Sequence, residues 1–396
     1  MIRREILKEV LLDNRNEVVK HQVIPRSFQF EEFGNYVFVG IRRAGKSFLL
    51  YQRIQELLHS GHTWNEMLYV NFEDERLIGM TAADLNLILE VRRLADNKYR
   101  AYVTGSNAKM LSQDVATTLG GRYITVHVYP YDFKEFLYAN GVEVTENSLF
   151  ATESRAEIKR IFNDYFRSGG FPEGASLAAK RDYLTSVYQK IYLGDIAARH
   201  SIENTFALRI LFRKLAESIK QPVSFTRITN IVASTGVKIS KNTVINYMEY
   251  AKDACLLIPI QNIADKLVER ETNPKYYFAD NGILNLLLLD ADTSLLENLV
   301  AVTLLRRYGT DDAVFFYNRN VEVDFYLPDT GVAIQVCYTM NLSDETFQRE
   351  VQALVKLNKV FECRQLLIIT YDDEERIELE KCAIEVIPVW KWLLGK

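Results

Sequence analysis

The residues from Gly40 to Ser47 have the types and spacing of a loop that holds a polyphosphate. They read G-x-x-x-x-G-K-S, follow the apolar run Tyr36 to Val39, and precede a run of helix-forming residues from Phe48 to Leu58. Glycine permits backbone angles that turn successive N–H groups toward an anion, and the N-terminus of the following helix adds its positive dipole end. The pattern therefore predicts a strand, a phosphate-binding loop and a helix, in that order.

Two side chains of this loop have separate expected roles. Lys46 is expected to reach the β- and γ-phosphates of ATP or ADP, and Ser47 to place its hydroxyl on Mg²⁺. The sequence thus indicates ATP and Mg²⁺ as cofactors. The residues expected to contact the nucleotide are Gly40, Ile41, Arg42, Arg43, Ala44, Gly45, Lys46, Ser47 and Phe48.

Length and composition favour several soluble globular domains. The chain has 396 residues, of which 48% are hydrophobic and 25% are charged, and its formal net charge is -4. This charge gives no overall positive field toward nucleic acid or membranes, so DNA binding would need a local patch. Because no apolar run reaches spanning length and the start of the chain lacks a signal-peptide pattern, we expect a cytoplasmic protein without a membrane partner.

Four motifs in the first third of the chain resemble those of a family of prokaryotic AAA-superfamily ATPases. Members of this family carry a C-terminal domain of uncharacterised function that is related to the PD-(D/E)XK nuclease fold. The likeness extends over nearly the whole chain. The motifs are Gly40–Ser47, Asn71–Leu77 (N-F-E-D-E-R-L), Thr104–Ala108 (T-G-S-N-A) and Gly121–Tyr123 (G-R-Y).

The resemblance implies further residues that act on the nucleotide. It places a sensor of the γ-phosphate at Ser106 or Asn107, and makes Arg122 a candidate arginine finger or sensor. A surface arginine beside a Gly-Gly turn is the alternative interpretation of Arg122. With Lys46, the expected catalytic set is Lys46, Asn107 and Arg122.

One part of the family pattern is absent. In P-loop sheets of this class, the acid that holds Mg²⁺ comes from an apolar strand just before the one that begins at Arg100. The sequence there offers only a predicted helix, Thr81 to Lys98. An earlier run, Met67 to Phe72, predicts a strand that leads to Glu73 and Asp74. These two are weak substitutes for positioning metal or water, and a solvated strand end is the alternative.

The missing strand has two explanations. Either this sequence lacks a stretch that the natural protein has, or the deletion is genuine and ATP is bound but turned over slowly or not at all. Loss of a central strand would leave neighbouring strands with unpaired backbone groups, each costing on the order of a few kcal/mol if buried. That cost favours the first explanation. ATP hydrolysis is therefore left open.

Beyond the sheet the chain is expected to form a helical lid and a winged helix. The lid includes the turn at Gly169–Glu173 and a helix from Tyr188 to His200, in which Arg199 either acts on a phosphate or is an exposed helical arginine. Three helices follow between residues 206 and 260, and strands near 256–260 and 275–278 would form the wing.

The third of these helices, with Ser240 as its N-cap, would enter the major groove if this domain binds DNA. Glu249 and Asp253 in the same helix leave a packing role as the alternative. The residues expected to face DNA are Lys241, Asn242, Thr243 and Asn246.

The last segment resembles the PD-(D/E)XK nuclease core. A helix that starts near Leu295 is followed by predicted strands at 314–317, 321–326 and 332–338. Glu297 and Asp324 match two of the metal-binding acids of active members. Gln335 and Cys337 stand where an acid and a lysine are needed, and neither an amide nor a thiol supplies that chemistry. We expect the fold to be retained and DNA cleavage to be lost.

The predicted fold class is α/β: a P-loop NTPase parallel sheet with a helical lid, a winged helix and a C-terminal restriction-endonuclease-like domain. The expected boundaries are 1–140, 141–205, 206–280 and 281–396. The leading hypothesis is an AAA-type ATPase switch that acts on DNA or on a protein partner, including a second copy of the chain. The alternative is a nucleotide-binding interaction module that does not hydrolyse ATP.

Overall fold

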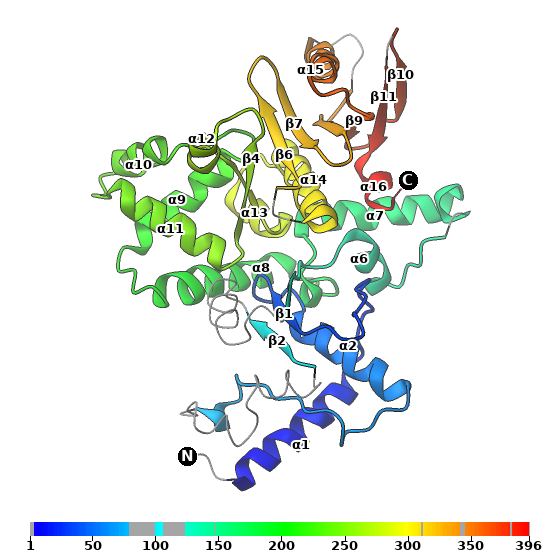
Figure 1. Ribbon diagram of the computed structural model, residues 1–396, viewed down its shortest axis with the longest axis vertical. Coiled ribbons are helices and arrows are strands. Elements are labelled where there is room, and N and C mark those ends of the chain that lie inside the picture. The colour runs from blue at the N-terminus through cyan, green and yellow to red at the C-terminus, as the bar shows by residue number, and fades with distance from the viewer. Residues whose placement is uncertain are drawn as a thin grey trace. The chain divides into compact units, whose positions relative to one another are not determined.

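The computed structural model describes residues 4–78, 100–105, 123–145, 147–309, 312–340, 345–380 and 382–395 (Figure 1). The chain divides into two compact units. The first consists of residues 1–40 and 45–128, and the second of residues 41–44 and 129–396. The division falls inside the predicted phosphate-binding loop, so that residues 41–44 belong to the second unit.

A three-stranded parallel sheet forms the centre of the first unit. Strand β1 (Tyr36–Val39) lies between β2 (Tyr102–Gly105) and β3 (Ile124–His127), with Val37 opposite Val103 in β2. All four residues of β1 are buried, whereas the residues of β2 are half-buried. Parallel strands are normally covered on both faces, so β1 has the environment expected of the strand before a phosphate-binding loop.

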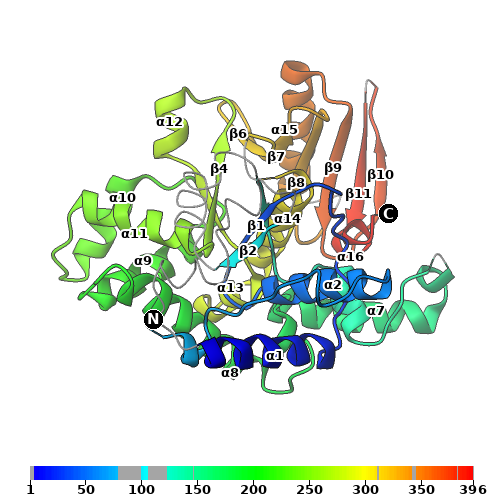
Figure 2. The same cartoon turned by 60° about the horizontal axis from the view of Figure 1, so that its bottom comes forward.

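Helices α1 (Arg4–Lys20) and α2 (Lys46–His59) belong to the same unit. Helix α1 packs against α2, and the two run side by side in Figure 2. Helix α2 starts at the lysine of the loop, two residues before the predicted run, so the predicted order of strand, loop and helix is confirmed.

One predicted strand in this unit is wrong, and a second run that suits a strand forms none. The apolar run at 18–24 is helical up to Lys20, because α1 continues to that residue and buries Val10, Asn14 and Val18 on one helical stripe with a spacing of four residues. Residues 67–72 form no strand either. The Asn71 side chain accepts the N–H of Glu73 and turns the chain, and a short 3-10 helix η1 (Glu75–Leu77) follows.

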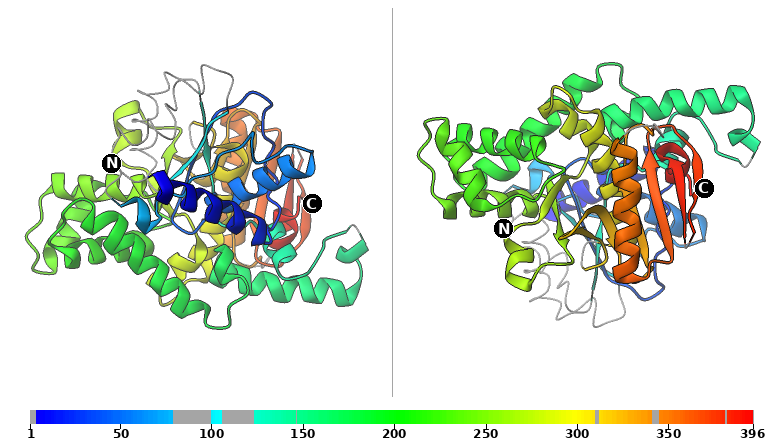
Figure 3. Two further views of the ribbon diagram at one scale, coloured as in Figure 1. Left: turned by 90° about the horizontal axis from the view of Figure 1, so that it is seen from below. Right: turned by 90° about the horizontal axis from the view of Figure 1, so that it is seen from above.

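The second unit contains the remaining helices that the structure describes. Helices α9 to α11 lie together in Figure 1, and α15 lies along the strands of a large sheet in the right panel of Figure 3. The helices are α6 (Phe133–Ala139), η2 (Asn147–Leu149), α7 (Thr152–Ser168), η3 (Pro172–Gly174), α8 (Lys180–Gln189), the π-helical η4 (Lys190–Ala198), α9 (Thr205–Glu217), α10 (Phe225–Ser234), α11 (Lys241–Asp253), α12 (Leu267–Thr272), α13 (Asn281–Leu287), α14 (Asp292–Tyr308), α15 (Glu345–Phe361) and α16 (Val389–Leu393).

An eight-stranded mixed sheet organises the C-terminal part of this unit, in the order β10-β11-β9-β8-β7-β6-β4-β5. Neighbouring strands β11 and β9, β9 and β8, and β4 and β6 are parallel, and the other pairs are antiparallel. The strands are β4 (Leu257–Asn262), β5 (Lys275–Phe278), β6 (Phe315–Asn318), β7 (Glu322–Leu327), β8 (Val332–Val336), β9 (Gln365–Thr370), β10 (Glu375–Glu378) and β11 (Ala383–Pro388).

The two strands expected to form a wing pair with each other, but they also join this sheet. Strand β4 is antiparallel to β5, and its last two residues, Gln261 and Asn262, pair with β6. The sheet therefore contains strands from both sides of residue 280.

A buried polar network connects the start of α13 to the turn after α7. Asp280 caps α13 by accepting the N–H of Gly282 and also accepts the N–H of Gly170. Asn298 of α14 donates to the side-chain oxygen of Asn281. A Cβ on Gly170 would lie 2.1 Å from the carbonyl oxygen of Tyr131, so only glycine fits this turn. Among the described helices, none combines the length and apolar character needed to cross a membrane.

Candidate functional site

The loop after β1 has the backbone of a phosphate-binding loop. A Cβ on Gly40 would lie 2.2 Å from the carbonyl oxygen of Val128, so glycine is required for this close approach. Arg43 and Gly45 have left-handed backbones, with φ values of 67° and 91°. Left-handed residues within a turn are typical of loops whose consecutive N–H groups point toward one anion.

The lysine and serine of the motif lie at the first turn of α2. Lys46 is 9% exposed, and its Nζ donates to the carbonyl oxygen of Gly40 at 3.0 Å. Ser47 is exposed, as a residue that contacts Mg²⁺ or nucleotide must be. Gly45 is the N-cap of α2, and as a glycine it has no side chain of its own to cap the helix. An anion at this helix N-terminus would be stabilised by the helix dipole.

Within the second unit, the two arginines of the loop form ion pairs with acids far along the chain. The Nε and Nη2 of Arg42 donate to both carboxylate oxygens of Asp195 at 2.7 and 2.8 Å. The Asp195 side chain is only 5% exposed, and Arg199 lies 3.8 Å from it. Arg43 donates to the exposed Glu173 at 2.6 Å. The bidentate contact of Arg42 is the stronger of the two because it is aligned and partly desolvated.

The sequence offered no signal for these partners. Asp195 lies in η4, a π-helical segment, and such segments are frequent at functional sites. It is one of many acids in the chain and is 153 residues from Arg42. Arg199, expected either to act on a phosphate or to be an exposed helical arginine, lies beside Asp195 and is about one-third exposed.

The substitutes for the missing acid have contacts of their own. Asp74 caps η1 and accepts two hydrogen bonds from the Arg76 side chain, which keep the pKa of its carboxyl below the usual value. Arg76 also pairs with Asp13. Glu73 is exposed beside this turn. These contacts agree with the alternative interpretation, an exposed segment end rather than a metal site.

Three expected residues lie outside the described part of the chain. They are Ser106, Asn107 and Arg122. The predicted helix at 81–98, where the family pattern has the acid-bearing strand, also lies outside the described residues. The roles of the three residues stay predictions.

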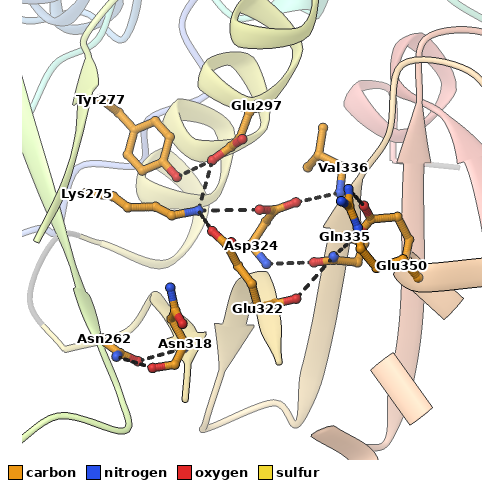
Figure 4. A network of polar contacts seen from close by, with 11 residues as sticks. Asn262, Lys275, Tyr277, Glu297, Asn318, Glu322, Asp324, Gln335, Val336 and Glu350 are labelled. Carbon is orange, nitrogen blue, oxygen red and sulfur yellow. Dashed lines mark hydrogen bonds and ion pairs between the residues drawn. The ribbon is translucent and has the colours of Figure 1, made fainter. Parts of the chain in front are cut away.

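The second unit contains a group of charged side chains, which we call the Lys275 cluster (Figure 4). Lys275 of β5 is fully buried, and its Nζ lies 3.4 Å from Glu297, 3.1 Å from Glu322 and 3.4 Å from Asp324. The Tyr277 hydroxyl donates to Glu297 at 2.8 Å. Helix α14 supplies Glu297 and strand β7 supplies the other two acids. The cluster consists of these five residues.

Gln335 and Glu350 border the cluster. The Asp324 backbone N–H donates to the Gln335 side-chain oxygen at 2.7 Å, and the Val336 N–H donates to Asp324 Oδ2 at 3.0 Å. The Gln335 amide also donates to the Glu350 carboxylate of α15. Gln335 therefore acts as a neutral connector between strands β7 and β8 and helix α15.

Burial and charge act in opposite directions on the ionisable groups of this cluster. Burial lowers the pKa of Lys275, but attraction by Glu297, Asp324 and Glu322 outweighs it, so the pKa is raised and the ammonium stays charged. Burial, reinforced by the charge of Glu297, raises the pKa of Asp324 to about 7, although Lys275 opposes the shift. Desolvation also raises the pKa of Tyr277.

The two acids that match the nuclease pattern, Glu297 and Asp324, contact the same ammonium group. Cys337 is half-buried, and its Sγ lies 3.0 Å from the carbonyl oxygen of Thr339. Lys275 was not among the predicted site residues, because its strand was assigned to a wing. The signal was a lysine at the start of the otherwise apolar run Lys-Tyr-Tyr-Phe. Among the residues that the structure describes, no set of three or more His, Cys, Asp or Glu side chains is arranged to hold a metal ion.

The three helices α9 to α11 have the predicted order. The Ser240 side chain accepts the N–H of Thr243 at 3.1 Å, which confirms the expected N-cap. Lys241, Asn242 and Asn246 are exposed, and Thr243 is half-buried. The surface that was expected to face DNA therefore has accessible side chains.

Two family models match parts of the chain. An AAA domain matches residues 33–91 and 85–137, in two segments that overlap at 85–91. A domain of unknown function, DUF8612, matches residues 159–294. The AAA match contains β1, the loop, α2, β2 and β3, so the P-loop lies in an AAA domain.

Two curated relatives extend over most of the chain. The uncharacterized protein MJ1544 of Methanocaldococcus jannaschii is 33% identical over 436 aligned positions, which include all of this chain and 96% of the relative. An uncharacterized protein of Haemophilus influenzae is 28% identical over 394 positions, 90% of this chain and 94% of the relative. The alignment with the archaeal protein has 436 positions against 396 residues here, so about 40 of its positions have no counterpart in this chain.

Proposed function

Because the chain belongs to the family of the archaeal protein MJ1544 and contains an AAA domain, we propose that it binds ATP with Mg²⁺ in the P-loop and responds by changing conformation. The geometry of the loop carries this proposal. Gly40 approaches the backbone of Val128 too closely for any side chain, Gly45 is left-handed, and Lys46 starts helix α2. These features support a polyphosphate site made by a helix N-terminus and a lysine.

We propose that hydrolysis depends on an acid-bearing strand beside β2. Two observations support its position, and a third supports its existence. The residues of β2 are half-buried although parallel strands are usually covered, and the AAA match is divided into two segments that overlap at 85–91. About 40 positions of the alignment with the archaeal relative have no counterpart in this chain. A chain with this strand would hydrolyse ATP. Without it, ATP would bind but the carboxylate that positions Mg²⁺ and water would be missing.

The intact mass of the natural protein separates these cases. A mass several kilodaltons above 45.8 kDa would mean that the natural chain contains further residues, and a match would favour the module that does not hydrolyse ATP.

The ion pairs of the loop support a route for the conformational change. Arg42 is held by Asp195 of η4, and Arg43 by Glu173 of η3. A polyphosphate bound to the loop would attract the same guanidinium groups and compete with both acids. Release of Asp195 or Glu173 would then alter the helical segments that contain them, which is the switch we propose.

DNA is the partner that we propose for the switch. The start of α11 exposes Lys241, Asn242 and Asn246, which are residue types that contact phosphates and base edges. Helices α10 and α11 have the order of a helix-turn-helix, and the antiparallel pair β4 and β5 supports the winged helix that we propose around them. A protein partner or a second copy of the chain is the alternative.

We propose that the C-terminal segment has a PD-(D/E)XK-like fold without nuclease activity. Helix α14 followed by the meander β6, β7 and β8 supports the fold, in the order that the resemblance implies. Gln335 and Cys337 argue against cleavage because they replace an acid and a lysine. Mg²⁺-dependent nicking of plasmid DNA that an Asp324→Ala variant lost would contradict this proposal.

ATP binding is tested with a fluorescent ATP analogue. Lys46→Ala should weaken binding by roughly tenfold or more, since it removes a charge-assisted contact to phosphate. Lys8→Ala is a matched control, because Lys8 is an exposed lysine of α1. Equal affinity of Lys46→Ala and wild type would contradict the proposal. Hydrolysis is measured separately as phosphate release. If wild type binds ATP but releases phosphate no faster than Lys46→Ala does, the module that does not hydrolyse ATP is favoured.

A further inference from the structure

Lys275 is a buried cation with three acidic neighbours. Its side chain is 0% exposed, and its Nζ lies between 3.1 and 3.4 Å from one carboxylate oxygen each of Glu297, Glu322 and Asp324. Glu297 and Asp324 are 4% and 13% exposed, whereas Glu322 is 47% exposed. A buried charge is tolerated only when it is paired and hydrogen-bonded, and here each buried acid depends on the same ammonium.

The two buried carboxylates are fixed by neutral donors. The Tyr277 hydroxyl donates to Glu297, and the Val336 backbone N–H donates to Asp324 Oδ2 (Figure 4). Because these donors come from strands β5 and β8, the carboxylates cannot turn to solvent without loss of these hydrogen bonds. They face a single position, and the Lys275 nitrogen occupies it.

Carboxylates are the ligand type that a divalent cation uses, but these three surround an ammonium and are not arranged to hold a metal ion. In this chain the Lys275 ammonium occupies the position between the carboxylates. Lys275 belongs to β5, the strand at the end of the sheet, and its contacts link β5 to α14 and to β7. Its full burial also keeps it away from any substrate in solvent, so it is not placed to contact a phosphate group.

We propose that the Lys275 ammonium is a built-in cation that takes the place of a divalent metal among Glu297, Glu322 and Asp324. The ammonium thereby offsets part of the negative charge of the cluster without Mg²⁺, and it links β5, α14 and β7. This inference concerns a site separate from the P-loop and does not rest on ATP binding.

The test compares thermal unfolding of the full chain with Mn²⁺ and with a chelator, in the absence of nucleotide. Wild type should show the same melting temperature in both. Lys275→Ala leaves three carboxylates without a cation, so its melting temperature should fall by roughly 5–10 °C in chelator. Mn²⁺ should then restore part of this loss.

A matched variant removes the charges that need the cation. In Lys275→Ala/Glu297→Gln/Asp324→Asn the two buried acids are neutral, so this chain should fold in chelator and lose the response to Mn²⁺. If Lys275→Ala does not fold in chelator, folding in Mn²⁺ supports the proposal and failure in Mn²⁺ contradicts it. Failure of the triple variant to fold also contradicts it.

The opposite result is equally clear. A rise in the melting temperature of wild type with Mn²⁺ that Asp324→Asn abolishes would mean that the cluster is an open metal site, and the proposal would be overturned. A Lys46→Ala chain should behave as wild type in this assay. Failure of this proposal and failure of the proposed ATP binding are therefore distinguishable.

Discussion

Lys46 and Lys275, which are both buried, lie in contrasting environments. Lys46 lies at the N-terminus of α2 and donates to the neutral carbonyl oxygen of Gly40, whereas Lys275 lies in a strand and faces three carboxylates. The helix dipole at the first site favours an additional negative charge, and the second site already contains more negative than positive groups. The same side chain is thus suited to an anionic ligand in one place and to internal neutralisation in the other.

The largest expected effect is a difference between the two lysines in their contribution to the free energy of unfolding. Lys275→Met should lower the free energy of unfolding by about 3–5 kcal/mol, because it leaves buried carboxylates without their partner. Lys46→Met should change it less, by about 1 kcal/mol, because the hydrogen bond from Lys46 to the Gly40 carbonyl oxygen is to a neutral group. Urea denaturation of both variants measures the difference. Equal losses would break the contrast between the two sites.

A smaller effect, on the affinity for ATP, is expected when the ion pair between Arg42 of the loop and Asp195 is weakened. Asp195→Asn should weaken the bidentate contact of Arg42, and a freed guanidinium should raise the affinity for ATP by roughly threefold to tenfold, equal to about 0.7–1.4 kcal/mol. Titration with a fluorescent ATP analogue measures this change. Glu173→Gln is the matched control, since its pair with Arg43 is exposed and should contribute less. A loss of affinity in Asp195→Asn would show that the ion pair orders the loop for the nucleotide instead.

The smallest expected effect is a difference in pH dependence. Asp324 has a pKa raised to about 7, so the native state binds its proton more tightly than the unfolded chain. Its contribution to stability is therefore full below about pH 4 and is lost as the pH rises through 7. The pKa of Asp74 is lowered, so the effect on stability has the opposite sign. The contribution of Asp74 to stability is present at neutral pH and is lost as the pH falls below the usual pKa of an aspartate.

Melting temperatures between pH 4 and 8 check these signs. Asp324→Asn should flatten the decline toward neutral pH, and Asp74→Asn should leave that decline in place. A steeper decline in Asp324→Asn would mean that another group, such as the buried Asp280 with a pKa raised to about 6, dominates it.

Local patterns in the sequence were reliable wherever one short segment defines the structure. The strand, loop and helix around Gly40 and Lys46 follow from glycine conformations and from the helix start, and Ser240 was recognisable as an N-cap from its side chain alone. Patterns failed where local signals were ambiguous. Val18 suited a strand as well as a helix, and only the buried stripe of α1 decided between them.

The sequence by itself determined the phosphate-binding loop, the order of the helices in the middle of the chain, and the pairing of Glu297 and Asp324 as candidate acids. Tertiary structure alone decided that β4 and β5 join the large sheet, that Asp195 holds Arg42, and that Lys275 fills the acid cluster. The physical reason is the range of the interactions. Backbone conformation and helix capping depend on a few neighbouring residues, whereas an ion pair depends on two charges that only the folded chain brings within about 4 Å.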